Sequence, residues 1–209
     1  VYSIDLKNIY FNTNDAPFPP LAYCFFHFLW HINPVDLPIK LSRWIELANY
    51  KNYLLLFMML MIIIIMGLYV VLKKILEEYS ENKILLFLIL IFFSAPFFAG
   101  AIERGNPAIF VLLLLFMFLY FKDHKSKILR ELALICLAVA ACFKIYPAIF
   151  GLLYIKEHRF KELFRLIIYG IILFFVPFAF TGGINGLKQY LMVILNFENH
   201  DCFRYTSIR

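Results

Sequence analysis

An uninterrupted apolar run in residues 52–72 limits what this chain can fold into more than any other feature. The run contains the sequence LLLFMMLMIIIIMGLYVVL and no charged residue. An α-helix needs about 20 apolar residues to cross the roughly 30 Å of hydrocarbon in a bilayer. We therefore predict that residues 52–72 form a transmembrane helix.

The composition indicates that membrane lipid surrounds the rest of the chain as well. Hydrophobic residues make up 63% of the 209 residues and charged residues 16%, whereas soluble domains are about 45–50% apolar and about 25% charged. The net charge of +6 needs no nucleic-acid partner, because the basic residues collect in short loops between apolar runs. Membrane lipids are the expected surroundings.

Further apolar runs predict an all-α, polytopic transmembrane helix bundle with about six membrane helices in this chain. Residues 84–102 and 105–121 are two uncharged runs joined by the polar turn Glu103-Arg104-Gly105-Asn106-Pro107, which predicts a helical hairpin. Residues 166–187 form another run, which we expect to end near Phe180 because Thr181-Gly182-Gly183 breaks a helix. Residues 21–32 are too few to span, which predicts an outer juxtamembrane helix.

Lys and Arg give the orientation, since they accumulate in short cytoplasmic loops. Three loops qualify, at residues 73–83, 122–130 and 156–165. With all three in the cytoplasm, we expect residues 1–51 to be an extracytoplasmic loop that carries the juxtamembrane helix. Residues 52–187 are then the transmembrane bundle, and residues 188–209 begin a further extracytoplasmic loop.

The stretch of residues 132–155 has two interpretations, because Lys144 interrupts it and Pro147 follows. A single span would bury the lysine in the bilayer, at a cost of about 2.5–3.5 kcal/mol, and would place two basic loops on opposite faces. A hairpin keeps the loops together, although its arms fall short of the full hydrocarbon thickness. We favour the hairpin, with its tip in a water-filled cavity that opens from the outer side.

On the hairpin interpretation, polar residues from distant segments converge on the outer face. Arg104 and Lys144 supply positive charge for a phosphate, and Glu103 or Asp15 could orient a sugar hydroxyl or accept its proton. Simpler roles stay open, since Arg104 could snorkel to headgroups and Lys144 could pair with Glu103.

Neither histidines nor cysteines indicate a metal site. His27 and His31 are four residues apart without a third ligand. The four cysteines lack CxxC spacing and are expected to act as small apolar side chains (Cys24, Cys136, Cys142 and Cys202). We expect no cofactor, and the sequence leaves a divalent metal ion open.

Three segments resemble a family of membrane glycosyltransferases. NDAPFPPLAY, ERGNPAIFVLLLLFMFLYF and LAVAACFKIYPAIFGLLYIKEHRFKELFRL together resemble glycosyltransferase family 87, the polyprenyl-phosphate-mannose-dependent type with a GT-C fold. The resemblance implies an inverting transfer of a hexose, mannose first, from a polyprenyl-phosphate donor to a glycolipid or glycan acceptor outside the cell membrane. It assigns substrate binding to Arg104, Lys144, Asn106 and Tyr23, and structural motif positions to Pro19, Pro20, Gly105 and Pro147.

The family places a catalytic aspartate in the first outer loop, shortly after the first span. Asp15 lies later than that position, so the resemblance implies that the base precedes Val1 and that this chain alone is inactive. The rival function is a transporter or flippase for an anionic lipid or solute, in which Arg104 and Lys144 would line the path. Paired half-sequences with broken helices would support a transporter, and we find none. A non-catalytic scaffold subunit is a third interpretation.

Overall fold

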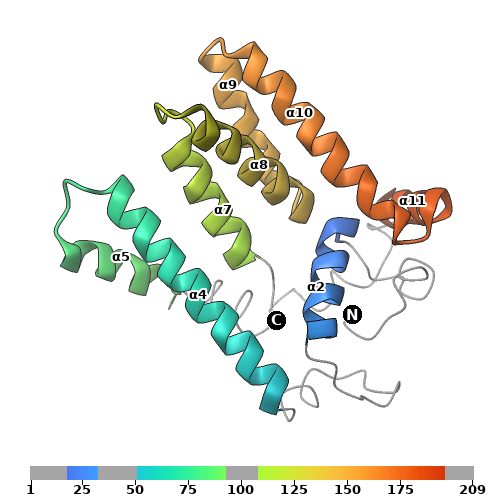
Figure 1. The fold of residues 1–209 in the computed structure, drawn as a ribbon, viewed down its shortest axis with the longest axis horizontal. Coiled ribbons are helices and arrows are strands. Elements are labelled where there is room, and N and C mark those ends of the chain that lie inside the picture. The colour runs from blue at the N-terminus through green and yellow to red at the C-terminus, as the bar shows by residue number, and fades with distance from the viewer. Residues whose placement is uncertain (1–17, 33–50, 93–107, 196–209) are drawn as a thin grey trace, which may run out of the picture. The chain divides into compact units, whose positions relative to one another are not determined.

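The computed structural model describes residues 18–32, 51–92 and 108–195 (Figure 1). In these ranges every regular element is helical and there is no strand, which confirms the predicted all-α class for the described part of the chain. The chain divides into two compact units: residues 1–34 with 171–209, and residues 35–170. Each is described separately.

The larger unit carries the helices between the α4 helix and the first part of α10. In chain order these are α4 (Lys51–Ile75), α5 (Glu81–Phe92), α7 (Ala108–Phe121), α8 (Lys127–Phe143), the 3-10 helix η3 (Tyr146–Gly151), α9 (Leu152–Lys156) and α10 (Phe160–Phe175).

Two segments among the described residues are long and apolar enough to cross a membrane. They are Met58–Ile75 in α4 and Phe160–Ala179, which begins with α10. Only 17% of each segment is buried within the protein, so most of its apolar surface faces outward, as it does in lipid-facing helices. The helix predicted over residues 52–72 is confirmed. The described part of the run at 105–121 forms α7, and a bundle of about six spans stays a prediction.

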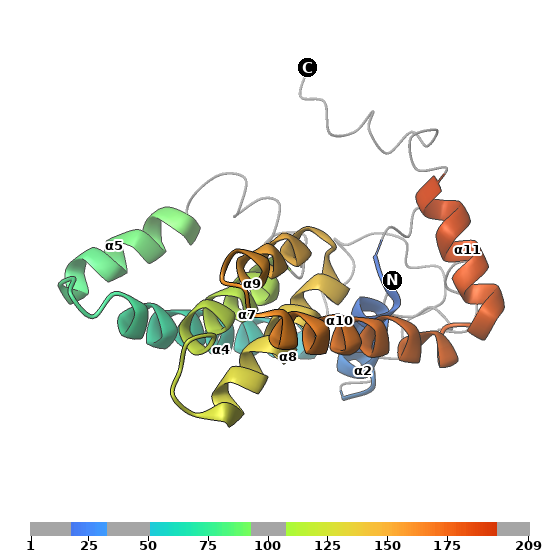
Figure 2. The same cartoon turned by 90° about the horizontal axis from the view of Figure 1, so that it is seen from above.

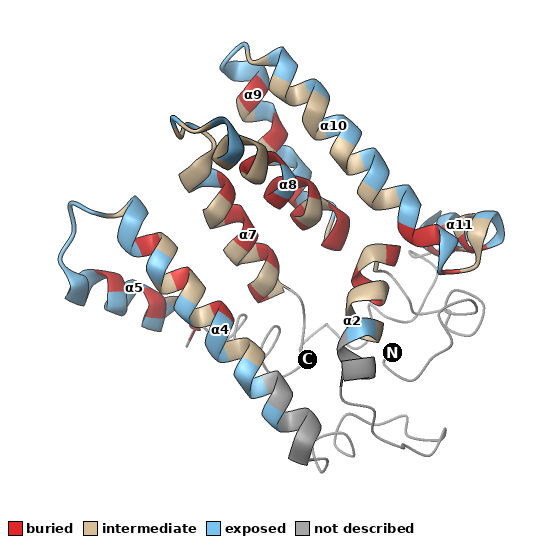
Figure 3. Ribbon diagram, in the orientation of Figure 1, coloured by how far each residue is buried: buried red, intermediate tan, exposed pale blue. Residues whose placement is uncertain are grey.

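One stripe of α4 packs inward, while the other residues whose burial is described in this helix are half-buried or exposed (Figure 3). The buried residues Ile64, Leu68 and Leu72 recur every four positions, so they lie on one face. They form a core with side chains of α5 and with Ile109 of α7. Gly67 lets α7 approach, since a Cβ atom there would lie 3.3 Å from Leu113 Cδ1. Small residues let membrane helices pack closely in this way.

Helix α7 also packs against α8 and the segment that follows it. Much of the buried face of α8 is small (Ala133, Cys136, Ala138, Ala140 and Cys142), which permits close packing without large cavities. Near the start of α7, Phe110 meets Phe143 edge-to-face with ring centroids 5.3 Å apart. Near its end, Phe118 contacts the rings of Phe150 and Tyr154 in the same manner. The two arms around Lys144 therefore follow the length of α7.

The C-terminal region differs from the sequence prediction in two places. Helix α10 begins at Phe160, inside the predicted basic loop, where Glu162 pairs with Arg159 of the preceding turn and Arg165 pairs with Glu131 of α8. It gives way to the 3-10 helix η4 (Val176–Ala179), which confirms the predicted end near Phe180. Residues 188–195, at the start of the predicted outer loop, continue helix α11 (Gly183–Leu195), and the position of this segment outside the membrane stays a prediction.

The smaller unit contains α2 (Pro20–Ile32), η4 and α11. Its core consists of Tyr23, Phe178 and Tyr190, with Phe18, Phe174 and Leu187 packed around them. The helix predicted over residues 21–32 is thus confirmed as an element, while its position at the outer interface stays a prediction.

The turn between η4 and α11 explains why α11 can follow a helix-breaking sequence. Gly182 and Gly183 have positive φ angles of 92° and 61°, which glycine adopts without strain. The buried Thr181 hydroxyl donates to the carbonyl oxygen of Pro177 over 3.3 Å. Gly186 packs against this turn so closely that a Cβ atom would lie 2.0 Å from the Thr181 carbonyl oxygen.

The close approach at Gly186 predicts that Gly186→Ala destabilises the protein by about 1–3 kcal/mol, because the turn must move to admit the methyl group. Gly170→Ala is the matched control: no atom lies within 4 Å of a Cβ there, so we expect a gain of about 0.5–1 kcal/mol from helix propensity. Unfolding of the purified protein in detergent measures both. Equal stability of the two variants would contradict the described packing of α11.

Candidate functional site

Lys144 stands where α8 ends and the chain turns. Its backbone is extended (φ −147°, ψ 136°), and its N–H group donates to the carbonyl oxygen of Ala140 over 3.0 Å, which caps the helix. The buried Pro147 begins the first turn of η3, where its fixed φ suits a helix start and its missing N–H group costs nothing. The sequence Lys144-Ile145-Tyr146-Pro147 therefore ends one helix and starts another. The Lys144 side chain is half-buried.

Ion pairs between the residues that follow α7 and those that follow α9 show that the chain reverses at this turn. Lys122 Nζ lies 2.5 Å from Glu157 Oε1, and Arg159 Nη1 lies 2.8 Å from Asp123 Oδ1. Arg159 also donates to the backbone carbonyl oxygen of Lys122 over 3.1 Å. The ends of a single span would be about 30 Å apart, whereas these loops touch. The chain therefore reverses within residues 132–155, as the predicted hairpin requires, while the placement of this hairpin in a membrane stays a prediction.

A left-handed residue makes the return from α9 to α10 possible. His158 has a φ angle of 56°, and its N–H group donates to the carbonyl oxygen of Ile155 over 3.1 Å. The next N–H group, that of Arg159, reaches Tyr154 O over 2.8 Å. This pair of bonds is the Schellman motif that closes many helices. It also stacks the Arg159 guanidinium 5.0 Å from the centre of the Tyr154 ring.

The cations of this contact are held in their charged forms. Partial burial lowers the pKa of Lys122, but hydrogen bonds to Asp123 and Glu157 outweigh it and raise the pKa overall. The pKa of Arg159 rises for the same reason, with Glu157 and Glu162 as its partners. With side-chain exposures of only 14% and 22%, Lys122 and Arg159 need these acidic partners to offset their lost hydration.

The third basic loop lies at the same end of the larger unit. Gly67 of α4 lies next to Leu113 of α7, and each residue precedes the C-terminal end of its own helix by the same number of residues. The two helices also run in the same direction (Figures 1 and 2). The α4–α5 turn therefore lies at the same end of the unit as the α7–α8 loop and the α9–α10 turn. We call this end the basic end. Lys144 lies at the opposite end, since its neighbour Phe143 contacts Phe110 near the start of α7.

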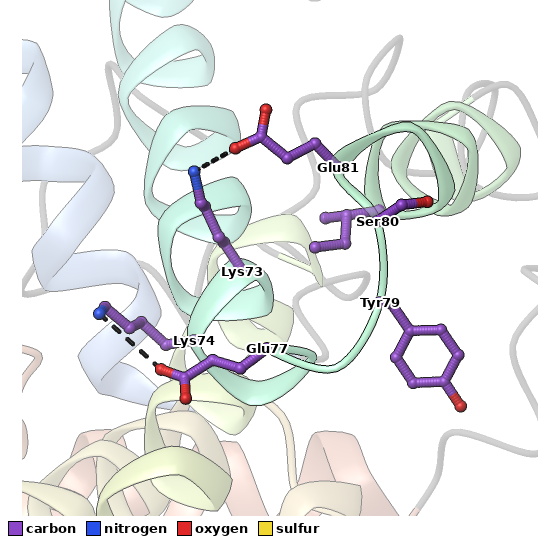
Figure 4. Close-up of a pocket in the computed structure, with 7 residues that line it drawn as sticks. Lys73, Lys74, Glu77, Tyr79, Ser80 and Glu81 are labelled. Atoms are coloured by element: carbon purple, nitrogen blue, oxygen red, sulfur yellow. Dashed lines mark hydrogen bonds and ion pairs between the residues drawn. The ribbon is translucent and has the colours of Figure 1, made fainter.

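A pocket of about 330 Å³ opens at the basic end, beside the α4–α5 turn (Figure 4). Its charged groups pair with one another: Lys73 points to Glu81, and Lys74 Nζ lies 3.9 Å from a Glu77 oxygen. The hydrogen bond from Lys73 lowers the pKa of Glu81. Because its charges are satisfied internally and Lys144 lies at the far end, this pocket is not the predicted phosphate site. Its lining residues are Lys73, Lys74, Glu77, Tyr79, Ser80, Glu81 and Ile84.

Comparison with known families decides what kind of protein this is. The model of glycosyltransferase family 87 matches residues 19–207, which is most of the chain and includes the reversal at Lys144. The chain belongs to glycosyltransferase family 87. No curated protein and no solved structure matches it. Glycosyl transfer is therefore the general activity of this family member, and the apolar α4 and α10 segments agree with a membrane location.

Three other residues of the predicted site belong to the smaller unit (Pro19, Pro20 and Tyr23). Pro20 begins α2, and the carbonyl oxygen of Pro19 accepts a hydrogen bond from Ala22 N over 3.1 Å. Tyr23 is buried in the aromatic core of the smaller unit, and this burial raises the pKa of its phenol. The remaining predicted residues lie outside the described residues (Asp15, Glu103, Arg104, Gly105 and Asn106). The convergence of all these residues on one site stays a prediction.

The described thiols and acidic groups do not form a metal-binding cluster. No group of three His, Cys, Asp or Glu side chains within the described ranges could hold an ion. Cys136 and Cys142 are buried in α8, and the Cys142 thiol donates to the Gly170 carbonyl oxygen over 3.6 Å. It thereby links α8 to α10.

The residues that close the hairpin were not predicted from the sequence, although the sequence contains a signal for them. Asp123, Glu157 and Glu162 are acidic residues within predicted basic loops, and opposite charges in two neighbouring loops indicate pairing between them. A second link missed in the same way joins α8 to α10, where Glu131 pairs with Arg165 and accepts a hydrogen bond from the Tyr169 hydroxyl over 3.0 Å.

The role of Arg159 in closing the hairpin predicts that Arg159→Ala lowers the free energy of unfolding by about 2 kcal/mol. The substitution removes hydrogen bonds to Asp123, to Glu157 and to the Lys122 carbonyl oxygen, together with the contact of the guanidinium with the Tyr154 ring. Arg130→Ala is the matched control, because Arg130 has no acidic partner within salt-bridge distance among the described residues. Denaturant unfolding in detergent measures the difference. The same loss in both variants would contradict this role.

Proposed function

We propose that this family member transfers a hexose, mannose first, from a polyprenyl-phosphate-linked donor to a glycolipid or glycan acceptor. The reaction takes place on the extracytoplasmic face of the cell membrane, which the protein crosses several times. Family membership supplies the glycosyl transfer. The donor, the acceptor and the sidedness are our proposal.

The position of Lys144 is the observation that carries this proposal. Its helix starts at the basic end, and the chain reverses at Lys144 before returning to that end. Since loops rich in Lys and Arg stay in the cytoplasm, the turn at Lys144 points toward the outer leaflet. An ammonium group there meets the donor phosphate where the lipid-linked sugar is presented.

Arg104 is the second cation that we assign to the donor phosphate. It lies outside the described residues but precedes Ala108, the first residue of α7, by only four positions. A chain of four residues spans at most about 14 Å. The start of α7 is also where Phe110 contacts Phe143, the neighbour of Lys144. Covalent connection and this contact together support a common phosphate site.

Two such cations fit the chemistry of the transfer. The acceptor hydroxyl oxygen attacks the anomeric carbon, a carboxylate takes the hydroxyl proton, and the bond from that carbon to the phosphate oxygen breaks. The polyprenyl phosphate leaves with the bonding electrons, so negative charge grows on it, and Arg104 and Lys144 stabilise that charge. Attack opposite the leaving group inverts the anomeric configuration.

The carboxylate and the sugar contacts complete the proposed site. Asp15 and Glu103 are the candidate bases within this chain. We assign Asn106 and Tyr23 to substrate binding. Pro19, Pro20, Gly105 and Pro147 would shape the segments that carry these groups, as Pro147 does where it begins η3. A transporter or flippase would use the same cations, but membership of a glycosyltransferase family favours transfer.

We predict that Lys144→Ala or Arg104→Ala in the complete protein lowers the rate of sugar transfer about 10²–10³-fold, the usual loss when one group that stabilises developing negative charge is removed. The measurement is transfer of labelled mannose from polyprenyl-phosphate mannose in membranes. Lys144→Arg keeps the charge and should retain part of the activity.

Lys83→Ala serves as the control for these variants, since Lys83 is exposed at the basic end, where it lies over the Tyr79 ring. It should transfer sugar at the normal rate. Normal transfer by both Lys144→Ala and Arg104→Ala, in protein inserted at normal levels, would remove the proposed phosphate site.

A further inference from the structure

The charged residues at the basic end of the larger unit fall into two sets. Those of the α4–α5 turn are matched locally: Lys73 pairs with Glu81, Lys74 pairs with Glu77, and Lys83 Nζ lies 5.8 Å from the centre of the Tyr79 ring. Glu78 adds another negative charge to the same turn. This turn therefore offers little excess positive charge to a ligand.

The surface around α8, α9 and α10 differs, because its acidic groups are already occupied. Asp123 and Glu157 pair with Lys122 and Arg159, and Glu131 pairs with Arg165. Five other cations of these elements have no acidic partner within salt-bridge distance in the described part of the chain. We call this set the cation surface (Lys125, Lys127, Arg130, Lys156 and Lys161).

The contacts among the three elements hold these cations at one end of the unit. The α7–α8 loop, which carries Lys125, touches the α9–α10 turn through the Lys122–Glu157 pair. Lys127 and Lys161 lie in the first turns of α8 and α10. These two helices are joined through Glu131 of α8, which pairs with Arg165 and accepts a hydrogen bond from Tyr169 of α10. Four members of the cation surface are exposed, and Arg130 is half-buried.

Large apolar side chains project to solvent beside these cations. Ile128 follows Lys127 and is 80% exposed, while Phe160 and Phe164 flank Lys161 with 59% and 65% of their surface exposed. A soluble anion gives no reason for apolar groups at such positions. Apolar residues next to Lys and Arg at the end of an apolar helix fit the boundary between headgroups and acyl chains.

We propose that the cation surface binds the headgroups of anionic phospholipids in the leaflet that the basic end faces. The lysines and Arg130 neutralise headgroup phosphates, and Ile128, Phe160 and Phe164 enter the acyl region beside them. Each basic residue near an anionic membrane surface strengthens binding about fivefold at low salt. This site lies at the opposite end of the unit from Lys144 and does not depend on the proposed sugar transfer.

The test compares two triple variants with the same loss of charge. Lys125→Gln with Lys127→Gln and Lys161→Gln removes three members of the cation surface. The control, with Gln at positions 73, 74 and 83, removes the three lysines of the α4–α5 turn. Native mass spectrometry of each purified protein measures retention of phosphatidylglycerol against phosphatidylcholine. We expect phosphatidylglycerol binding to weaken at least about tenfold in the first variant and less than about twofold in the control.

Each other outcome would overturn the proposal. Equal weakening in both variants would mean that only net charge matters, and no weakening in either would mean that the cation surface takes no lipid. A third arm adds glycerol phosphate, the water-soluble headgroup: if it displaces phosphatidylglycerol at equal concentration, the site is one for soluble phosphate. Unchanged circular dichroism of the first variant, whose substitutions are all exposed, keeps the comparison interpretable.

Discussion

The contact between Lys122 and Glu157, joined by Arg159 and Asp123, fixes the path of the chain through the larger unit. Because these residues flank the segment from α8 to α9 on both sides, their meeting requires the chain to reverse between them. The reversal falls at Lys144 and Pro147, where α8 is capped and η3 begins. The position of Lys144, the residue proposed to bind the phosphate, therefore follows from ion pairs at the opposite end of the same helices.

Two kinds of interaction hold this hairpin. Aromatic contacts of Phe110 with Phe143, and of Phe118 with Phe150 and Tyr154, bury apolar surface along α7. The ion pairs add less net energy, since removing charges from water offsets much of their attraction. Their contribution is to select one pairing of the loops. At the tip, the half-buried Lys144 interrupts an apolar stretch of the sequence, and a charge within such a stretch of a membrane protein favours a functional role.

Physical rules applied to the sequence predicted the elements that depend on lipid. The apolar run before Lys73 became α4, and the cost of burying Lys144 in a single span favoured a hairpin, which agrees with the reversal of the chain at Lys144. The rules failed where tertiary contacts override local signals. Helix α11 follows a glycine pair that signals a break, because Gly182 and Gly183 make the turn while Tyr190 of α11 is buried in an aromatic core. Helix α10 extends through charged residues, of which Arg165 pairs with Glu131 of α8 and Glu162 pairs with Arg159 in the preceding turn. The candidate site was predictable only as residue types, and a common site of Arg104 and Lys144 stays a proposal because Arg104 lies outside the described residues.

The most direct test of this account asks whether the two loops beside the hairpin share one side of the membrane. Lys125 and Lys156 are exposed on either side of it, and each can be replaced singly by cysteine in a protein whose native cysteines are changed to alanine. Labelling of intact cells with a membrane-impermeant maleimide then reports which side each position faces. The account predicts that both cysteines are protected in intact cells and that both react after permeabilisation. Labelling of one but not the other in intact cells would show that the chain crosses the membrane between them, and would contradict the reversal at Lys144.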